Sequence, residues 1–121
     1  MTFKILAIDD DPAITELLGL LLRGYGLEMI PANDGQLGLD LARSEKPDLI
    51  LLDLMMPDVD GWQVCKMVRS FSKKVPIIII SALDDPAIIS STLDAGADDY
   101  LVKPVPGSKL IEHINNLIRR A

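Results

Sequence analysis

The chain has 121 residues, 49% of them hydrophobic, which is enough apolar surface for one packed domain without disulfides or a structural metal. Its formal net charge of −6 disfavours direct binding of nucleic acid or of an anionic membrane. No apolar run approaches the about 20 residues of a membrane span, and the first residues lack the features of a signal peptide. With one cysteine, which cannot form an internal bridge, these features predict a cytoplasmic protein.

The first half of the chain alternates between apolar runs and amphipathic segments. A strand is predicted over residues 3–8, followed by a helix that Asp11 caps and that ends near Gly24. A weaker strand over 27–32 precedes a second helix, which Asp34 caps. The apolar residues spaced to face the core are Ile14, Leu17, Leu18, Leu21 and Leu22 in the first helix and Leu37, Leu41 and Ala42 in the second.

The second half continues the same alternation. Further strands are predicted over 49–52, 77–80 and 100–102. Further helices are predicted over about 61–70 with Val64, Met67 and Val68 inward, from Asp85 and Pro86 to Gly96, and over about 106–120. His113, the only histidine, is expected to face solvent on the last helix. Five strands alternating with five helices predict an α/β domain with a parallel sheet and helices on both faces.

Polar side chains follow four of these strands at the point where each strand ends. Asp9 and Asp10 follow the first strand and Asp53 follows the third. Ser81 follows the fourth, and Lys103 comes directly after the fifth. Parallel sheets bind ligands outside the carboxyl ends of their strands, so these five side chains are expected to meet at one edge of the sheet.

These residue types in one pocket favour phosphoryl-transfer chemistry. Three carboxylates close together repel one another unless a cation binds, and oxygen ligands suit Mg²⁺. A lysine ammonium and a serine hydroxyl can hold phosphoryl oxygens, and a carboxylate can be the nucleophile that forms an aspartyl phosphate. Taken singly, each residue has a plainer explanation as a helix cap, a strand-end hydroxyl or a surface charge. Their joint placement at the strand ends favours the functional interpretation.

Four stretches resemble the receiver family of bacterial response regulators: Ile5–Pro12, Leu51–Gly61, Ile79–Ala82 and Ala95–Pro104. They follow one another in the family's order, and the resemblance covers the whole chain, residues 1–121, as one receiver domain. The resemblance implies a flavodoxin-like, doubly wound sheet of five parallel strands in the order 2-1-3-4-5, with five helices.

The resemblance also assigns the acidic residues. It implies that Asp53 is the phosphoacceptor. Asp10 and Asp53 are expected to bind Mg²⁺ directly, Asp9 mainly through water, and Met55 through its backbone carbonyl.

The remaining assignments concern the switch. Ser81 is expected to bond a phosphoryl oxygen, and Lys103 to pair with the phosphate. Ser81 and Tyr100 are expected to form the switch that changes the surface, and Pro104 is expected to follow a cis peptide bond.

By the same resemblance, the chain is a signalling domain that promotes its own phosphorylation and dephosphorylation, and not an enzyme acting on outside substrates. A histidine kinase or phosphotransfer protein is the expected donor. The expected target is a downstream protein or an output domain in a longer chain, reached through the face formed by the fourth helix, the fifth strand and the fifth helix. Ile88 and Ile89 are adjacent on that face, which predicts a hydrophobic docking surface on a monomer, or at most a weak dimer.

Three alternatives remain beside this interpretation. A phosphatase of the haloacid dehalogenase type also uses aspartates, Mg²⁺, lysine and a hydroxyl, but its order of motifs differs and 121 residues leave no room for a substrate cap. A nucleotide-binding module is disfavoured because neither glycine-rich phosphate motif is present. A degenerate receiver is disfavoured because every expected pocket residue is present.

Overall fold

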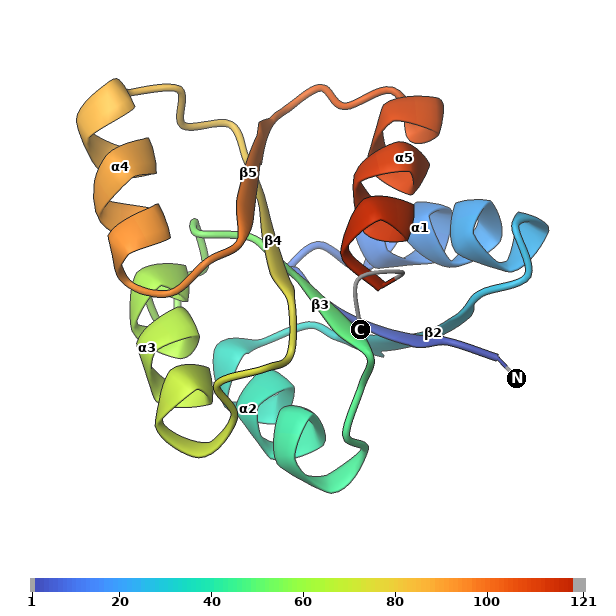
Figure 1. Ribbon diagram of the computed structural model, residues 1–121, viewed down its shortest axis with the longest axis horizontal. Coiled ribbons are helices and arrows are strands. Elements are labelled where there is room, and N and C mark those ends of the chain that lie inside the picture. Colours follow the sequence, from blue (N-terminus) through green and yellow to red (C-terminus); the bar gives the residue numbers. More distant parts are fainter. Residues whose placement is uncertain (1, 119–121) are drawn as a thin grey trace.

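The computed structural model describes residues 2–118 and contains all ten predicted elements (Figure 1). The strands are β1 (Lys4–Ile8), β2 (Glu28–Ala32), β3 (Leu49–Leu52), β4 (Ile77–Ser81) and β5 (Asp99–Val102). The helices are α1 (Pro12–Gly24), α2 (Gly35–Ser44), α3 (Gly61–Phe71), α4 (Pro86–Asp94) and α5 (Gly107–Ile118). The predicted end of the last helix, at Arg120, lies outside the described residues. None of the helices within residues 2–118 is long and apolar enough to cross a membrane.

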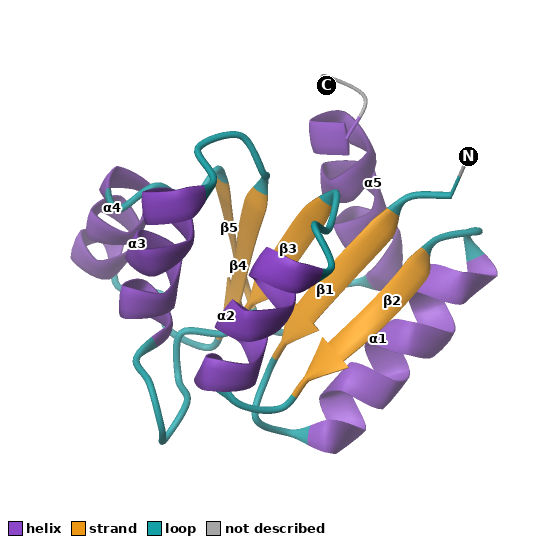
Figure 2. Cartoon of the chain, turned by 90° about the horizontal axis from the view of Figure 1, so that it is seen from below, coloured by secondary structure: helices purple, strands orange, loops and turns teal. Residues whose placement is uncertain are grey.

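The five strands form one parallel sheet in the order β2-β1-β3-β4-β5, as predicted. Ile8 at the end of β1 pairs with Ala32 on one side and Leu52 on the other, so these three strands end level with one another. Helices α1 and α5 cover one face, while α2, α3 and α4 cover the other (Figures 1 and 2). The strand ends are therefore left open at one edge.

Both faces of the sheet are buried, which explains why the strand sequences are almost wholly apolar. In β1, Leu6 and Ile8 pack toward α2 and α3, whereas Ile5 and Ala7 pack toward α1 and α5. All four side chains are at most 1% exposed. This central strand contributes to both cores, and its end is consequently held rigidly in place.

Aspartates cap four of the helices. Asp11, Asp34 and Asp85 accept hydrogen bonds from the backbone N–H of Ala13, Leu37 and Ala87, at 3.0, 2.7 and 2.8 Å. These three caps were predicted. Asp60 caps α3 in the same way through the N–H of Trp62, at 2.9 Å. Side-chain oxygens thus satisfy backbone donors that the first turn of a helix leaves unpaired.

Three apolar residues predicted to face the core are instead exposed: Leu17 (63%), Leu37 (43%) and Met67 (44%). In α1 the buried residues are Thr15, Gly19 and Leu22, so the helix presents two small residues and one leucine to the sheet. Gly19 lets α1 lie close to β2, because a Cβ there would be 2.7 Å from Met29 Cε. Because Gly19 packs against β2, the helix is rotated so that Leu17 faces outward.

His113 does not face solvent as expected. Its Nδ1 contacts the carboxylate of Asp99, and both side chains are partly buried, at 29% and 30% exposed. The contact joins α5 to the start of β5, because the first residue of that strand is the acid. An aspartate on the neighbouring strand therefore draws the ring toward the sheet.

A second polar cluster lies at the opposite edge of the sheet, around Arg69 of α3. Its Nε donates to the carbonyl of Gly96 (2.9 Å), and its Nη1 donates to the carbonyls of Ser72 (3.0 Å) and Val75 (2.8 Å). Its Nη2 pairs with Asp98 at 2.9 Å. The same Asp98 oxygen accepts the N–H at the start of β4, at 2.8 Å. One guanidinium thus joins α3 to the loops that precede β4 and β5.

Candidate functional site

The strand ends bring three carboxylates together. The N–H of Asp53 donates to the carbonyl of Ile8 at 3.0 Å, and the N–H of Asp9 donates to Ala32 at 3.0 Å, so each aspartate continues the ladder of its sheet neighbour. One carboxylate oxygen from each of Asp9, Asp10 and Asp53 lies within 4.8 Å of the others. Asp9 and Asp53 are buried while Asp10 is exposed. The predicted acidic cluster is thus present at the predicted edge.

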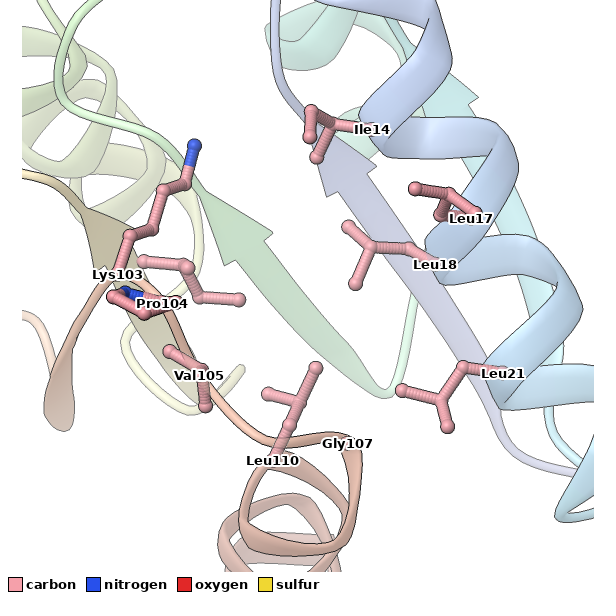
Figure 3. Close-up of a pocket in the computed structure, with 10 residues that line it drawn as sticks. Ile14, Leu17, Leu18, Leu21, Lys103, Pro104, Val105, Gly107 and Leu110 are labelled. Carbon is pink, nitrogen blue, oxygen red and sulfur yellow. The ribbon is translucent and has the colours of Figure 1, made fainter.

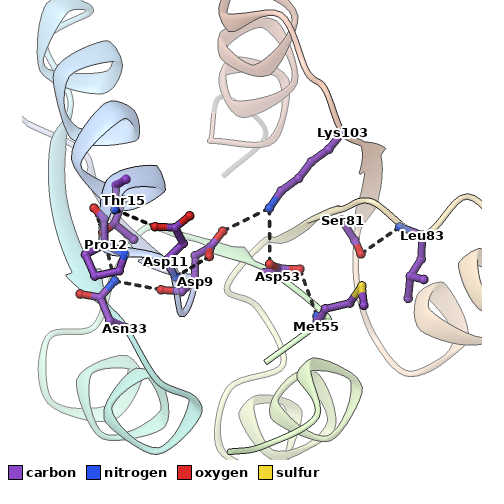
Figure 4. Close-up of polar contacts among 11 residues, drawn as sticks. Asp9, Asp11, Pro12, Thr15, Asn33, Asp53, Met55, Ser81, Leu83 and Lys103 are labelled. Carbon is purple, nitrogen blue, oxygen red and sulfur yellow. Dashed lines mark hydrogen bonds and ion pairs between the residues drawn. The ribbon is translucent and has the colours of Figure 1, made fainter. Parts of the chain in front are cut away.

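Asp9 is fixed by neighbours from two directions (Figure 4). Its Oδ1 accepts the N–H of Asp11 at 3.0 Å, and its carbonyl accepts Nδ2 of Asn33 at 2.9 Å. Asn33 also donates to the hydroxyl of Thr15 at 3.1 Å. Burial raises the pKa of Asp9, although the Asp11 N–H and the Lys103 ammonium favour its charged form. This carboxylate is therefore held in place at a cost in solvation.

Lys103 spans the two buried carboxylates. Its Nζ lies 3.3 Å from Oδ2 of Asp9 and 3.4 Å from Oδ2 of Asp53. Burial alone would lower the pKa of the lysine, but the carboxylates of Asp53 and Asp9 outweigh it and the pKa is raised. The peptide bond between Lys103 and Pro104 is cis. The lysine is consequently charged and points into the acidic cluster.

The loop after Asp53 is packed tightly against its backbone. Oδ1 of Asp53 accepts the N–H of Met55 at 3.0 Å, while the Met55 side chain is 55% exposed. The N–H of Gly61 donates to the Leu54 carbonyl at 3.1 Å. A Cβ at Gly61 would lie 2.4 Å from the carbonyl oxygen of Asp53. Only glycine therefore fits where α3 begins against the end of β3.

Ser81 and Tyr100 meet at the loop between β4 and α4. Ser81 is fully buried, and its Oγ accepts the N–H of Leu83 at 3.3 Å. The hydroxyl of Tyr100 donates to the Leu83 carbonyl at 2.7 Å, so the ring lies inward against the core. Burial raises the pKa of the Tyr100 phenol. One loop residue thus connects the strand-end hydroxyl to the aromatic ring.

Trp62 joins the acceptor loop to α4. It occupies the first turn of α3, directly after Gly61, and its indole N–H donates to the carbonyl of Ser91 at 3.2 Å. The Nζ of Lys66 lies 3.8 Å from the centroid of the indole ring. The ring is half-buried and packs against the core beneath α3 and α4. Within residues 2–118, the bond from Trp62 to Ser91 is the one side-chain hydrogen bond from α3 to a residue inside α4, and the Sγ of Cys65 contacts the carbonyl of Ala95 just after that helix.

An apolar groove adjoins the acidic cluster on the face of the sheet that α1 and α5 cover (Figure 3). It has a volume of about 570 Å³. One wall is the outward stripe of α1, and the opposite wall is the segment from Lys103 to Leu110. The α1 residues on it are Ile14, Leu17, Leu18 and Leu21. Because Lys103 belongs to both the groove and the cluster, the groove leads directly to the buried carboxylates.

Sequence reasoning missed several residues that shape this site. Asn33 follows β2 at the same edge as the acids, which is a signal that could have been used. Gly61 lies inside a recognised motif, but its close approach to Asp53 becomes visible only in three dimensions. Leu83 acts through its backbone, so its residue type carries no signal.

The composition of the cluster fits a divalent cation. Three carboxylates face one ammonium, which leaves excess negative charge in a largely buried setting. Hard oxygen donors suit Mg²⁺, which commonly binds through one or two carboxylates and retains waters. Asp10 is exposed and leaves the site open to solvent on that side. The donors present are therefore those that such an ion requires.

Residues 5–115 match the family model of the response regulator receiver domain, and the chain belongs to this family of signalling domains. It is 43% identical over 122 residues to the response regulator MprA of Mycolicibacterium vanbaalenii, covering 99% of this chain and 52% of that protein. It is 39% identical over 120 residues to the DNA-binding response regulator MtrA of Mycolicibacterium smegmatis, with the same coverage of 99% and 52%. The chain thus spans about half the length of these curated relatives.

Solved structures show the same fold. A CheY-like response regulator receiver domain protein from Methanospirillum hungatei superposes with a TM-score of 0.95 at 28% identity, covering 99% of this chain and 96% of that one. A Francisella response regulator receiver domain superposes with a TM-score of 0.93 at 35% identity, covering 98% of both chains. These likenesses confirm the predicted fold class and the predicted family.

Proposed function

We propose that Asp53 accepts a phosphoryl group from a phosphohistidine of a histidine kinase or phosphotransfer protein. The observation that carries this proposal is the convergence of Asp9, Asp10 and Asp53 within 4.8 Å, with Lys103 between two of them. A carboxylate that ends a central buried strand is a rigidly placed nucleophile. Membership of the receiver family supports the same role.

In the transfer, an oxygen of Asp53 attacks the phosphorus while the bond between phosphorus and the donor's imidazole nitrogen breaks. The imidazole nitrogen keeps the electron pair and takes a proton from water. Lys103 lies 3.4 Å from Asp53, so its ammonium is placed to neutralise a phosphoryl oxygen. Positioning and charge neutralisation supply most of the catalysis in such transfers. Attack by water on the phosphorus later releases inorganic phosphate and restores the carboxylate.

Asp10 and Asp53 would hold Mg²⁺ directly, Asp9 through water, and the Met55 backbone carbonyl would complete the protein's share. When bound, the ion supplies positive charge that offsets the phosphoryl oxygens and the crowded carboxylates. The fixed positions of Asp9 and Asp53 favour this role, since neither has to be reorganised for binding. Removing the ion should therefore stop phosphorylation while leaving the fold intact.

Ser81 and Tyr100 would pass the change to the face formed by α4, β5 and α5. The Ser81 hydroxyl now accepts the Leu83 N–H, and it would move away from that contact when it donates to a phosphoryl oxygen near Lys103. Because Leu83 also holds the hydroxyl of Tyr100, the loop, the ring and α4 would respond together. Phosphate would thus select one of two packings of this face.

The donor protein would lie in the apolar groove between α1 and the segment from Lys103 to Leu110. Leu17 is 63% exposed there, and the groove ends at Lys103. An apolar helix of the donor seated in it would bring a phosphohistidine close to Asp53. The longer relatives support a target within a longer chain, and a separate downstream protein is the alternative. The domain would act as a cytoplasmic monomer, or at most a weak dimer, without touching nucleic acid itself.

The test is incorporation of phosphate from a small phosphoramidate donor with Mg²⁺, followed by intact mass. Wild type should gain one phosphate that hydroxylamine removes, as it removes acyl phosphates. Asp53→Asn should gain none, because an amide is not a nucleophile for this step. Asp84→Asn, at an exposed position in the loop after β4, is the matched control and should behave as wild type. EDTA should abolish the reaction in wild type.

Two results would contradict the proposal. Uptake by Asp53→Asn at the wild-type rate would mean that another residue is the acceptor. Repeated turnover of an outside phosphomonoester, with no phosphate retained on the protein, would favour the hydrolase alternative. The switch is tested separately. If Lys103→Ala and Ser81→Ala still responded to beryllofluoride at the α4–β5–α5 face as wild type does, neither residue would belong to the signalling path.

A further inference from the structure

A second groove, far from Asp53, lies where the C-terminal ends of α2 and α3 meet. Its volume is about 380 Å³. The apolar walls come from Ala42, Pro47, Phe71 and Val75, and the rim carries Arg43 and Lys46. These segments precede β3 and β4, so the groove lies at the amino edge of the sheet. Nothing in the phosphoryl-transfer proposal uses it.

The rim of this groove is basic, although the chain as a whole is acidic. Four of the chain's twelve lysines and arginines lie on it or on the loop between two lining residues: Arg43, Lys46, Lys73 and Lys74. The nearby acids are engaged elsewhere, since Glu45 pairs with Lys4 at 3.9 Å and Asp98 pairs with Arg69 at 2.9 Å. Within residues 2–118, none of the four rim cations is in an ion pair.

Lys46 has a backbone conformation that glycine would adopt more easily. Its φ is +46°, and it is the non-glycine residue at positive φ in the described chain. It follows Glu45, the C-cap of α2, at the position where helices most often place glycine. A lysine there costs stability relative to glycine. A strained residue that keeps a charge on the rim points to a role for that charge.

Phe71 supplies an apolar surface beneath this charge. It is the last residue of α3 and is 36% exposed. The guanidinium carbon of Arg43 lies 4.8 Å from the centroid of its ring. The groove therefore combines an aromatic wall with a cation already held above it, which suits a ligand that has both an apolar and an acidic part.

The loop that carries Lys73 and Lys74 is fixed in shape. Arg69 donates to the carbonyls on both sides of the two lysines, Ser72 at 3.0 Å and Val75 at 2.8 Å. The N–H of Val75 also donates to the hydroxyl of Ser72 at 3.4 Å. Both lysines are exposed. The loop thus presents two charges at fixed positions beside the groove, which lowers the entropy lost when a partner binds.

We propose that this basic-rimmed groove docks an acidic segment of a partner protein, with an apolar side chain of the segment between Phe71 and Val75. The four rim cations provide the charge complementarity, and the volume suits one or two side chains. A nucleic acid fits less well, because its many phosphates would meet a molecule of net charge −6. Basic residues at helix ends also stabilise the helix dipole, but that role does not explain the exposed aromatic wall.

The probe is a short dye-labelled peptide that alternates glutamate and leucine, with fluorescence anisotropy as the measurement. Wild type should bind it, and binding should weaken as salt is raised. Lys46→Gly should weaken binding about threefold while raising the urea midpoint, because glycine relieves the strained backbone. The single variant Lys73→Glu should weaken binding about fivefold. Lys109→Glu on α5 is the matched control and should weaken binding only as much as its change in net charge predicts.

The outcomes separate the docking role from a structural one. Lowered binding together with raised stability in Lys46→Gly supports the proposal, since a merely structural lysine would move the two in the same direction or not at all. Absence of peptide binding, or equal losses in Lys109→Glu and the rim variants, overturns it. Competition by single-stranded DNA or by phosphatidylserine vesicles as strong as by unlabelled peptide also overturns it. All variants should still be phosphorylated at the wild-type rate, so this test does not depend on Asp53.

Discussion

The two edges of the sheet carry polar clusters with opposite arrangements of charge. At the amino edge, one guanidinium makes four hydrogen bonds, including an ion pair with Asp98. At the carboxyl edge, one ammonium lies 3.3 and 3.4 Å from two buried carboxylates, and a third carboxylate adjoins them. The first cluster has a partner for each group, whereas the second has too much negative charge.

This difference separates a cluster that stabilises the fold from one that is prepared for a ligand. A partly buried cation surrounded by carbonyls and one acid is satisfied without any further molecule. Three carboxylates around one lysine repel one another. The pKa of Asp9 is raised, mainly by burial and further by the carboxylate of Asp53. Removing the cation at the amino edge should therefore destabilise the molecule, whereas removing a carboxylate at the carboxyl edge should stabilise it.

The largest effect is expected for Arg69→Ala. The change removes the donor to the carbonyls of Gly96, Ser72 and Val75 and the cation paired with Asp98, and we expect a loss of about 3 kcal/mol in the free energy of unfolding. Urea denaturation followed by circular dichroism measures it. Arg23→Ala, at an exposed arginine in the last turn of α1, is the control and should change stability by less than about 0.5 kcal/mol. A loss under about 1 kcal/mol for Arg69→Ala would mean that the amino-edge cluster is not a stabilising one.

A smaller effect is expected where the backbone is tight at the carboxyl edge. In Gly61→Ala the new methyl group meets the carbonyl of Asp53, and overpacking of this kind should cost about 2 kcal/mol. Gly24→Ala is the matched control, because nothing lies within 4 Å of its Cβ position. That control should be neutral or gain up to about 1 kcal/mol from helix propensity. Equal stabilities in thermal melts would show that the start of α3 yields easily.

The smallest effect, and the one of opposite sign, is expected for Asp9→Asn. Because the folded-state pKa of Asp9 is raised, its protonated form favours folding, and stability is lost as the pH rises from 3.8 through the folded pKa. At neutral pH in EDTA, the variant should therefore be slightly more stable than wild type. The difference should shrink as the pH falls toward 3.8. Urea titrations across this range check it, and a variant that is less stable at neutral pH would show that repulsion does not dominate this edge.

Much of the fold could be predicted because it depends on local patterns. Short apolar runs predicted the strands. Aspartates at the start of helical patterns, two of them followed by proline, predicted three helix caps. The polar set of the site was also predictable, since parallel strands end at a common edge and each strand end is visible in the sequence. Ser81 and Lys103 lie at the edge where this argument put them.

What could not be predicted depends on contacts between distant segments. The apolar spacing of α1 fits either of two rotations of the helix, and the close packing of Gly19 on Met29 decides between them. Leu17 was consequently placed on the wrong side. The inward turn of His113 likewise depends on Asp99, a residue of another element. Such pairings carry no signature within a single segment.

Trp62 has a consequence for how this molecule can be observed. The chain contains one tryptophan, so all of its indole fluorescence comes from a single position. That indole is hydrogen-bonded to Ser91 of α4 and lies under the ammonium of Lys66. A shift of α4 relative to α3 would change both the polarity around the excited ring and its quenching. The fluorescence of Trp62 in the unlabelled protein should therefore report a displacement of α4 relative to α3, and it can be followed in real time during a titration.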